Sequence, residues 1–335
     1  MGTPRNVRTA FASVEAAVVV GMIGLACCVA AVGGQHARTR AGLAGSLANL
    51  KKIAEVGAHY AADYDEQVWS FTWNADEHET SYPDLESPGV GAAAVMYQST
   101  DIVRRLSGDD TIPRLTNRFR PPFTSLLVLA DYLGESLPAE WMVSPGDAVR
   151  LGWQADPDDP PEMGDDNLAW RYIFGLYGSS YGLMPAFWAR DEATMEEGNT
   201  VYQYPSQHDL FWVPTMDFGN RRESEILFPA QKVRVAERES YFFGVRPVYY
   251  LHPSARVPLL MADGSAAART TADANTSFKP NNPPNQGSSA ADYRPNPIYE
   301  APTAGGGELD DKLEMYYKWT RRGLRGIDFS GERAE

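Results

Sequence analysis

An acidic loop between residues 156 and 167 holds the densest group of potential metal ligands in the chain. Its carboxylates are the hard oxygen ligands that Ca²⁺ prefers, so calcium is the one cofactor that the sequence leaves open. The candidate calcium ligands are Asp158, Asp159, Asp165 and Asp166. The loop lacks the regular alternation of known calcium loops, and a solvated acidic loop explains the same residues.

The histidines show no spacing that a zinc or catalytic site requires. They are His36, His59, His78, His208 and His252. His252 and Asp263 flank a predicted strand, but an Asp-Gly turn and a single histidine at a strand edge are common without chemistry. No glycine-rich phosphate-binding loop follows a predicted strand. We therefore expect a protein that is not an enzyme, with a secreted hydrolase as a distant alternative.

Glu15 is a carboxylate at the entrance of an uncharged run that extends from Ala16 to Gly34. About 18 apolar residues are enough to cross a bilayer as a helix. A charge at the bilayer centre costs roughly 2.5 to 3.5 kcal/mol, so an intramembrane acid normally has a partner. Glu15 either has such a partner or lies at the headgroup level, where its cost is small. Arg5 and Arg8 precede the run and favour a cytoplasmic start.

The segment from Arg5 to Val32 resembles the leader and first helix of type IV pilins and type II secretion pseudopilins. Phe11, Val14 and Glu15 match the first, fourth and fifth mature positions of that family, and Ala10 stands where the family has Gly. The resemblance implies that a prepilin peptidase cleaves after Ala10 and methylates the new amine of Phe11. It also implies that Glu15 pairs with the terminal amine of a neighbouring subunit, since each buried charge is costly alone.

The same resemblance implies a location and a set of partners. The chain would be a single-pass protein of the bacterial cytoplasmic (inner) membrane, with its head outside the cytoplasm, in the periplasm or at the cell surface. Its partners would be other pilin-like subunits, the prepilin peptidase and the inner-membrane secretion machinery.

Three further regions resemble bacterial pseudopilin-like proteins with an H-X9-DG C-terminal domain. Residues 43–65 are similar to the segment that follows the membrane helix in that family, although the family's Cys is absent. His252, Asp263 and Gly264 resemble the H-X9-DG box, with ten residues instead of nine between His and Asp. Residues 319–329 resemble the "W-T-R-G-G-L-x-G-x-D-F" ending of the family.

Two other interpretations of the first segment remain open. Ala31-Val32-Gly33 is an acceptable small-residue site for ordinary signal peptidase, and an uncleaved signal anchor has the same composition. The mature N-terminus, either Phe11 or a residue near Gly34, distinguishes these interpretations. The adjacent Cys27 and Cys28 lie within the apolar run, so the exported part contains no disulfide.

The predicted fold class is α+β, with a long N-terminal helix packed on a mainly antiparallel β-sheet head with long loops. After a leader of residues 1–10, residues 11–34 form the membrane half of the helix and residues 35–67 its amphipathic half. Apolar side chains recur at steps of three and four in the second half. They include Leu43, Leu47, Leu50, Ala54, Gly57, Ala61 and Tyr64. This is the architecture of pilins.

Residues 68–269 are long enough for one globular head with its own core. We predict helices over residues 92–106 and 123–133, the second starting near Pro121-Pro122. Strands are predicted over residues 232–237, 241–245, 248–251 and 257–262. The last of these ends in an Asp263-Gly264 turn, a good hairpin signal between apolar runs.

The C-terminal part begins with residues 270–308, which are rich in Pro, Asn and Gly and read as a linker or loop. Residues 309–335 recover an amphipathic pattern. We expect them to dock on the head, because exposing Tyr316, Tyr317 and Trp319 together would be unfavourable.

The formal net charge of -14 opposes nucleic-acid binding. The leading hypothesis is a pseudopilin-like structural subunit, inserted in the membrane and assembled through its N-terminal helix into a secretion or pilus-like filament. The alternative is a membrane-anchored surface module with a plain signal anchor, which binds glycans through exposed tryptophans. The candidates for that role are Trp69, Trp73, Trp188 and Trp212.

Overall fold

A computed structural model describes most of the chain downstream of the apolar run. The described residues are 37–116, 120–159, 162, 167–189, 202–209, 211–212, 219–277, 289–303 and 312–330. The predictions for the leader, Ala10, Phe11, Glu15 and the apolar run lie outside these residues. None of the helices in the described part of the chain is long and apolar enough to cross a membrane.

The fold is α+β, as predicted, and is built around one four-stranded antiparallel sheet in the order β1-β4-β5-β6. Its strands are β1 (Tyr181–Leu183), β4 (Val233–Glu237), β5 (Arg256–Met261) and β6 (Ala266–Thr270). Two small antiparallel pairs join β2 (Tyr202–Gln203) to β3 (Phe211–Trp212) and β7 (Ala290–Asp292) to β8 (Lys312–Glu314). In β4 the register shifts between Val233 and Val235, which leaves Arg234 at a bulge.

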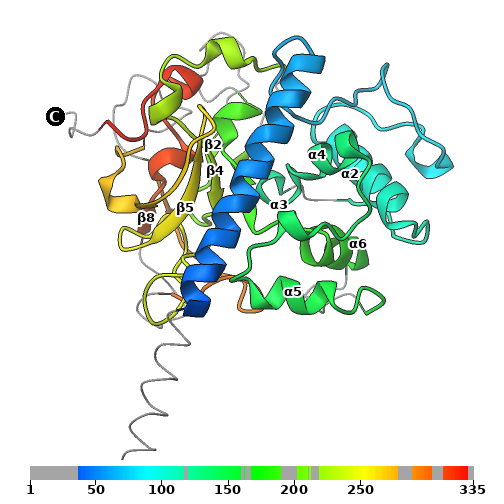
Figure 1. Cartoon of the computed structure of the whole chain (residues 1–335). Helices are drawn as coiled ribbons and strands as arrows, with labels where there is room; N and C mark the ends of the chain where they lie inside the picture. Colours follow the sequence, from blue (N-terminus) through cyan, green and yellow to red (C-terminus); the bar gives the residue numbers. More distant parts are fainter. Residues whose placement is uncertain are drawn as a thin grey trace, which may run out of the picture.

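A helix over residues 37–63 crosses the front of the molecule, with the sheet on one side and the short helices on the other (Figure 1). The short helices are α2 (Ala92–Ser107), α3 (Pro121–Thr124), α4 (Leu127–Leu133), α5 (Ala148–Gln154) and α6 (Leu168–Trp170). A π-helical segment, η3 (Arg171–Leu176), follows α6. Single 3-10 turns are η1 (Pro83–Leu85), η2 (Glu140–Met142), η4 (Pro185–Phe187), η5 (Glu223–Glu225), η6 (Pro229–Gln231), η7 (Thr271–Asp273), η8 (Tyr316–Lys318) and η9 (Gly323–Arg325).

The apolar periodicity of residues 43–64 becomes the buried face of the helix 37–63. Leu50, Ile53, Val56 and Tyr60 are all buried, at steps of three and four. Gly57 lets the buried indole of Trp69 lie directly on the helix backbone, because an added Cβ would be 2.4 Å from the ring.

The helix 37–63 ends in a turn with left-handed residues. Asp65 and Glu66 have φ of 52° and 61°, and the Glu66 N–H donates to the Ala61 carbonyl at 2.8 Å. Such a bond satisfies one of the terminal carbonyl groups that the helix leaves free.

Several predicted elements are confirmed. Helix α2 matches the prediction for residues 92–106. Strands β4 and β5 match the predictions for 232–237 and 257–262. The helix predicted over residues 123–133 is present as α3 and α4, which a turn at residues 125–126 separates.

The strands predicted over residues 241–245 and 248–251 are wrong. Residues 241–247 form a loop with Gly244 at φ 90°, and Pro247 lacks the N–H that a central ladder needs. Only an isolated bridge between Glu239 and Tyr249 remains. The buried rings of Tyr249 and Tyr250 explain the apolar pattern that suggested a strand.

The C-terminal segments pack into the same core as the rest of the head. In residues 289–303, which belong to the segment predicted as a linker or loop, Ala291, Tyr293 and Tyr299 are buried and pack on the head. Tyr317 and Trp319 are also buried; Tyr317 lies in the 3-10 turn η8, and Trp319 directly follows this turn.

Candidate functional site

His252 and Asp263 lie beyond opposite ends of β5, so the structure does not bring them together. The Nδ1 atom of His252 is 2.7 Å from the hydroxyl of Ser254. The carboxylate of Asp263 accepts hydrogen bonds from the backbone N–H of Ser265 at 2.9 Å and from its hydroxyl at 2.6 Å. Gly264, at φ 83°, closes the predicted hairpin between β5 and β6. These residues shape turns.

The candidate calcium ligands gain no support as a site. Asp158 and Asp159 are exposed, and neither forms an ion pair within the described ranges. Asp165 and Asp166 lie outside the described residues. A calcium site in this loop stays a prediction.

The segment Gly178–Gly182 has the G-x-S-x-G spacing, which sequence reasoning overlooked. In serine hydrolases this motif exposes its serine after a strand, next to a histidine. Here Ser180 is fully buried and precedes a strand, and its hydroxyl donates to the Asp147 carboxylate at 2.7 Å. It also accepts from the Ser144 N–H at 3.0 Å, so it is held as a structural group.

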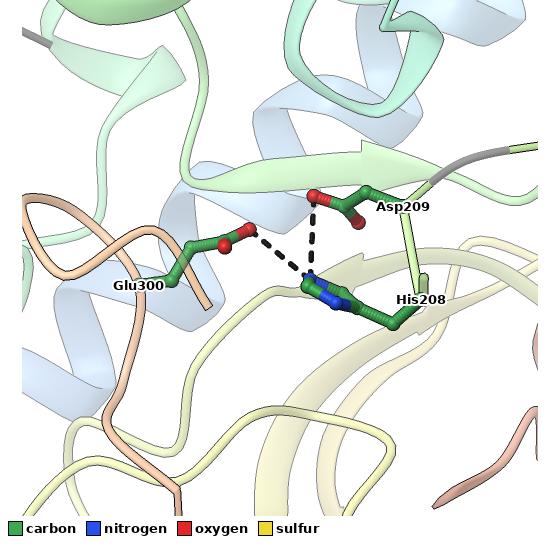
Figure 2. Close-up of side chains that lie close together, drawn as sticks. All are labelled: His208, Asp209 and Glu300. Atoms are coloured by element: carbon green, nitrogen blue, oxygen red, sulfur yellow. Dashed lines mark hydrogen bonds and ion pairs between the residues drawn. The ribbon is translucent and has the colours of Figure 1, made fainter. Parts of the chain in front are cut away.

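Three side chains with metal-binding chemistry meet in the interior: His208, Asp209 and Glu300 (Figure 2). His208 and Asp209 precede β3, and Glu300 lies in the stretch of residues 289–303 near the C-terminus. Their potential ligand atoms all lie within 4.8 Å of one another. The Nε2 atom of His208 is 3.4 Å from each carboxylate. No sequence signal links residues that are 92 positions apart.

Two buried cations complete this cluster. Arg238 Nη2 is 3.3 Å from the Asp209 carboxylate and 3.3 Å from that of Glu300. Its guanidinium carbon also lies 3.5 Å from the ring centroid of Phe123. Lys318 Nζ donates to the backbone carbonyl of His208 at 2.5 Å.

The charges of this cluster balance one another. Burial alone would raise the pKa of Asp209, but the charge of Arg238 and the hydrogen bond from His208 hold it well below its usual range. Burial together with the charge of Glu300 raises the pKa of Glu239, next to Arg238, to about 8. Burial lowers the pKa of Lys318 to about 8.

The protonation of His208 decides whether the cluster suits a metal. Burial lowers its pKa, but Asp209 and Glu300 outweigh this effect and raise it to about 9. The backbone N–H of Arg294, however, donates to Nδ1 at 3.1 Å, and only a ring with an unprotonated Nδ1 can accept this bond. The geometry therefore favours the neutral ring with its proton on Nε2, directed at the carboxylates. A metal ion would need the Nε2 atom without its proton, so the cluster does not fit a metal. We call the ion pairs of Asp209 and Glu300 with Arg238, together with His208, the ionic clamp.

A second buried acid connects the helix 37–63 to the sheet. Ser46 on the helix donates to Glu237 of β4 at 2.9 Å, and Tyr181 of β1 donates to Ser46 at 3.1 Å. Burial, with a smaller effect from the charge of Asp147, raises the pKa of Glu237 to about 8. At neutral pH this carboxyl is mostly protonated.

The tryptophans suggested for glycan binding differ in accessibility. Trp69 and Trp188 are buried and cannot contact a ligand, which corrects that part of the prediction. Trp212 belongs to β3, and its side chain is not among those described. Trp73 is half-buried, so part of its side chain is accessible. Comparisons of this chain with protein-family models, with curated proteins and with solved structures find no match.

Proposed function

We propose that this chain is a non-enzymatic, membrane-tethered subunit of the pilin-like kind, which packs beside similar subunits through its N-terminal segment. The observation that carries this proposal is the position of the helix 37–63. Its described part starts three residues after the apolar run ends at Gly34, spans about 40 Å at 1.5 Å per residue, and lies against an antiparallel sheet. A helix that leaves a membrane and carries a sheet-based head has this form.

The surface around the start of this helix also supports the proposal. The face of α5 that is exposed carries Ala148, Val149, Leu151 and Gly152, without a charge. Val245, in the loop after β4, is fully exposed. Gly45 of the helix lies beside Pro145, so α5 starts near the foot of the helix, as Figure 1 shows. The uncharged face of α5, next to the exposed Arg38 and Arg40 at the start of the described helix, suits a head that rests on a bilayer.

The proposal assigns Glu15 to pairing with the amine of Phe11 in an adjacent copy. The purified native protein should then begin at an N-methylated Phe11, as measured by intact mass and N-terminal sequencing. Glu15→Ala should reduce cross-linking between neighbouring subunits in membranes at least about tenfold, since an unpaired buried ammonium would remain. The melting temperature of the head should not change.

Glu55→Ala is the matched control, because Glu55 is an exposed acid on the described part of the helix. It should leave both cross-linking and processing as they are. A native protein that retains Met1, or one that starts near Gly34, contradicts the proposal.

A further inference from the structure

A cleft of about 360 Å³ opens near the end of the helix 37–63 that is farther from residue 37. Tyr60 of the helix, the segment 67–77, the turn before α2 and Asn220 form its walls. Its volume is within the range of sites that hold small organic ligands. The cleft is separate from the ionic clamp around His208, because the two share no residue.

Trp73 forms an aromatic wall of this cleft, and Gln98 fixes the backbone that carries it. The side chain of Trp73 is half-buried and so partly accessible, whereas Tyr60 and Phe71 are buried. The backbone N–H groups of Thr72 and Trp73 donate to the same oxygen of Gln98, at 2.8 and 3.0 Å. Gln98 is itself buried in α2, so the ring is presented by a fixed backbone.

Several polar groups of the cleft have no hydrogen-bond partner among the described residues. The hydroxyl of Ser70 is the clearest case, because the side chain is 7% exposed and its oxygen is buried without a partner. A buried unpaired hydroxyl costs stability and needs an explanation. The side-chain amides of Gln67 and Asn220 also line the cleft and make no hydrogen bond within the described ranges.

The chemistry of the lining selects one class of ligand. Among the described residues that line the cleft, Glu77 is the only charged one, so an anion would be repelled. A purely apolar ligand would leave the side-chain amides of Gln67 and Asn220 unpaired. A cation would be satisfied by Glu77, but an aromatic cage needs more than one accessible ring. A sugar carries neighbouring hydroxyl groups that both donate and accept hydrogen bonds. These groups can pair with amide side chains, which donate and accept, and with a carboxylate, which accepts.

We infer that this cleft binds a neutral carbohydrate of one or two sugar rings. The ring of Trp73 stacks on the apolar face of a sugar, while Gln67, Asn220 and Glu77 bind its hydroxyl groups. The inference does not depend on the proposed tether, although that tether would place the cleft at the membrane-distal end of the head.

The test uses the full chain in a detergent without a sugar headgroup. The probes are glucose, galactose, N-acetylglucosamine, cellobiose, maltose and lactose, each followed by saturation-transfer NMR and by Trp fluorescence. We expect at least one of them to bind with a Kd of about 1 mM or below, and Trp73→Ala to weaken it at least about tenfold. Trp73→Phe should retain part of the affinity.

Gln67→Ala separates a ligand-binding role from a structural one. It should weaken sugar binding several-fold but leave the melting temperature unchanged, because the Gln67 side-chain amide lines the cleft and makes no hydrogen bond within the described ranges. Trp153→Ala, at a half-buried tryptophan outside the cleft, should not alter sugar binding.

Three results would overturn the inference. They are the absence of binding by every sugar at about 10 mM, well above the expected Kd; binding that survives Trp73→Ala; and preferential binding of tetramethylammonium through Trp73 and Glu77, which would make the cleft a cation site.

Discussion

Glu237 and Glu239 are buried acids whose protonation links stability to pH. Burial is the main cause that raises the pKa of each to about 8, and each has one carboxyl oxygen without a partner among the described residues. A raised carboxyl pKa contributes stability that is fully present below the unfolded pKa, about 4.5. This contribution is lost as pH rises to about 8, because the unfolded chain ionises first. These two groups make the head less stable at mildly alkaline pH.

Glu237→Gln should flatten this pH dependence. The amide keeps the size and the hydrogen bond from Ser46 but cannot ionise. Denaturant unfolding should show a loss of stability between pH 5 and pH 8 in the wild type that is smaller in the variant, by on the order of a few kcal/mol. Glu140→Gln, at an exposed acid, is the control and should follow the wild type. A variant that keeps the full slope would show that Glu237 is ionised when folded.

At the scale of elements, the helix 37–63 depends on close contact with its neighbours. Gly57 lies on Trp69 and Gly42 on Phe242, where an added Cβ would come within 2.4 and 2.6 Å of the rings. Small residues on this helix therefore do more than permit helix formation. They set the distance between the helix and the head.

Gly57→Ala should destabilise the head by about 1–3 kcal/mol, although Ala is the better helix former. The reason is the clash with the fully buried Trp69 ring. Gly152→Ala in α5 is the matched control, because its added Cβ would meet nothing within 4 Å. It should be neutral or stabilise by about 0.5–1 kcal/mol. Equal thermal stability of the two variants would contradict the packing argument.

At the scale of the whole molecule, both ends of the described chain are fastened to β4. Ser46 of the N-terminal helix donates to Glu237, and Asp328 near the C-terminus accepts from the Val233 N–H at 2.8 Å. Lys232, fully buried, lies 3.3 Å from Asp328. The last segment is therefore part of the packed head.

Asp328→Ala should lower the free energy of unfolding by about 3–5 kcal/mol, since it leaves the ammonium of Lys232 buried without its carboxylate. Limited proteolysis should then release the C-terminal segment first. Arg325→Ala, at an exposed residue of the same segment, should behave as the wild type. An Asp328→Ala protein of unchanged stability would show that the segment docks without this pair.

Local periodicity in the sequence predicted the parts of the fold that depend on near neighbours. Helix α2, strands β4 and β5 and the turn at Gly264 follow from residue spacing and turn chemistry. The strand prediction failed at residues 241–251. There Tyr249, Tyr250 and Leu251 are buried in the core although the backbone forms loops and turns. Burial there comes from distant aromatic residues, which a local pattern does not reveal.

The sequence by itself determined the charge, the apolar run with Glu15 before it, and the amphipathic pattern of the first helix, because these are properties of neighbouring residues. Tertiary structure alone decided the sites. His208 meets Glu300 from 92 positions away, and Trp73 stays accessible while Trp69 and Trp188 are buried. Contacts between distant segments depend on how the whole chain packs, and identical residue types acquire different roles from the surroundings that packing gives them.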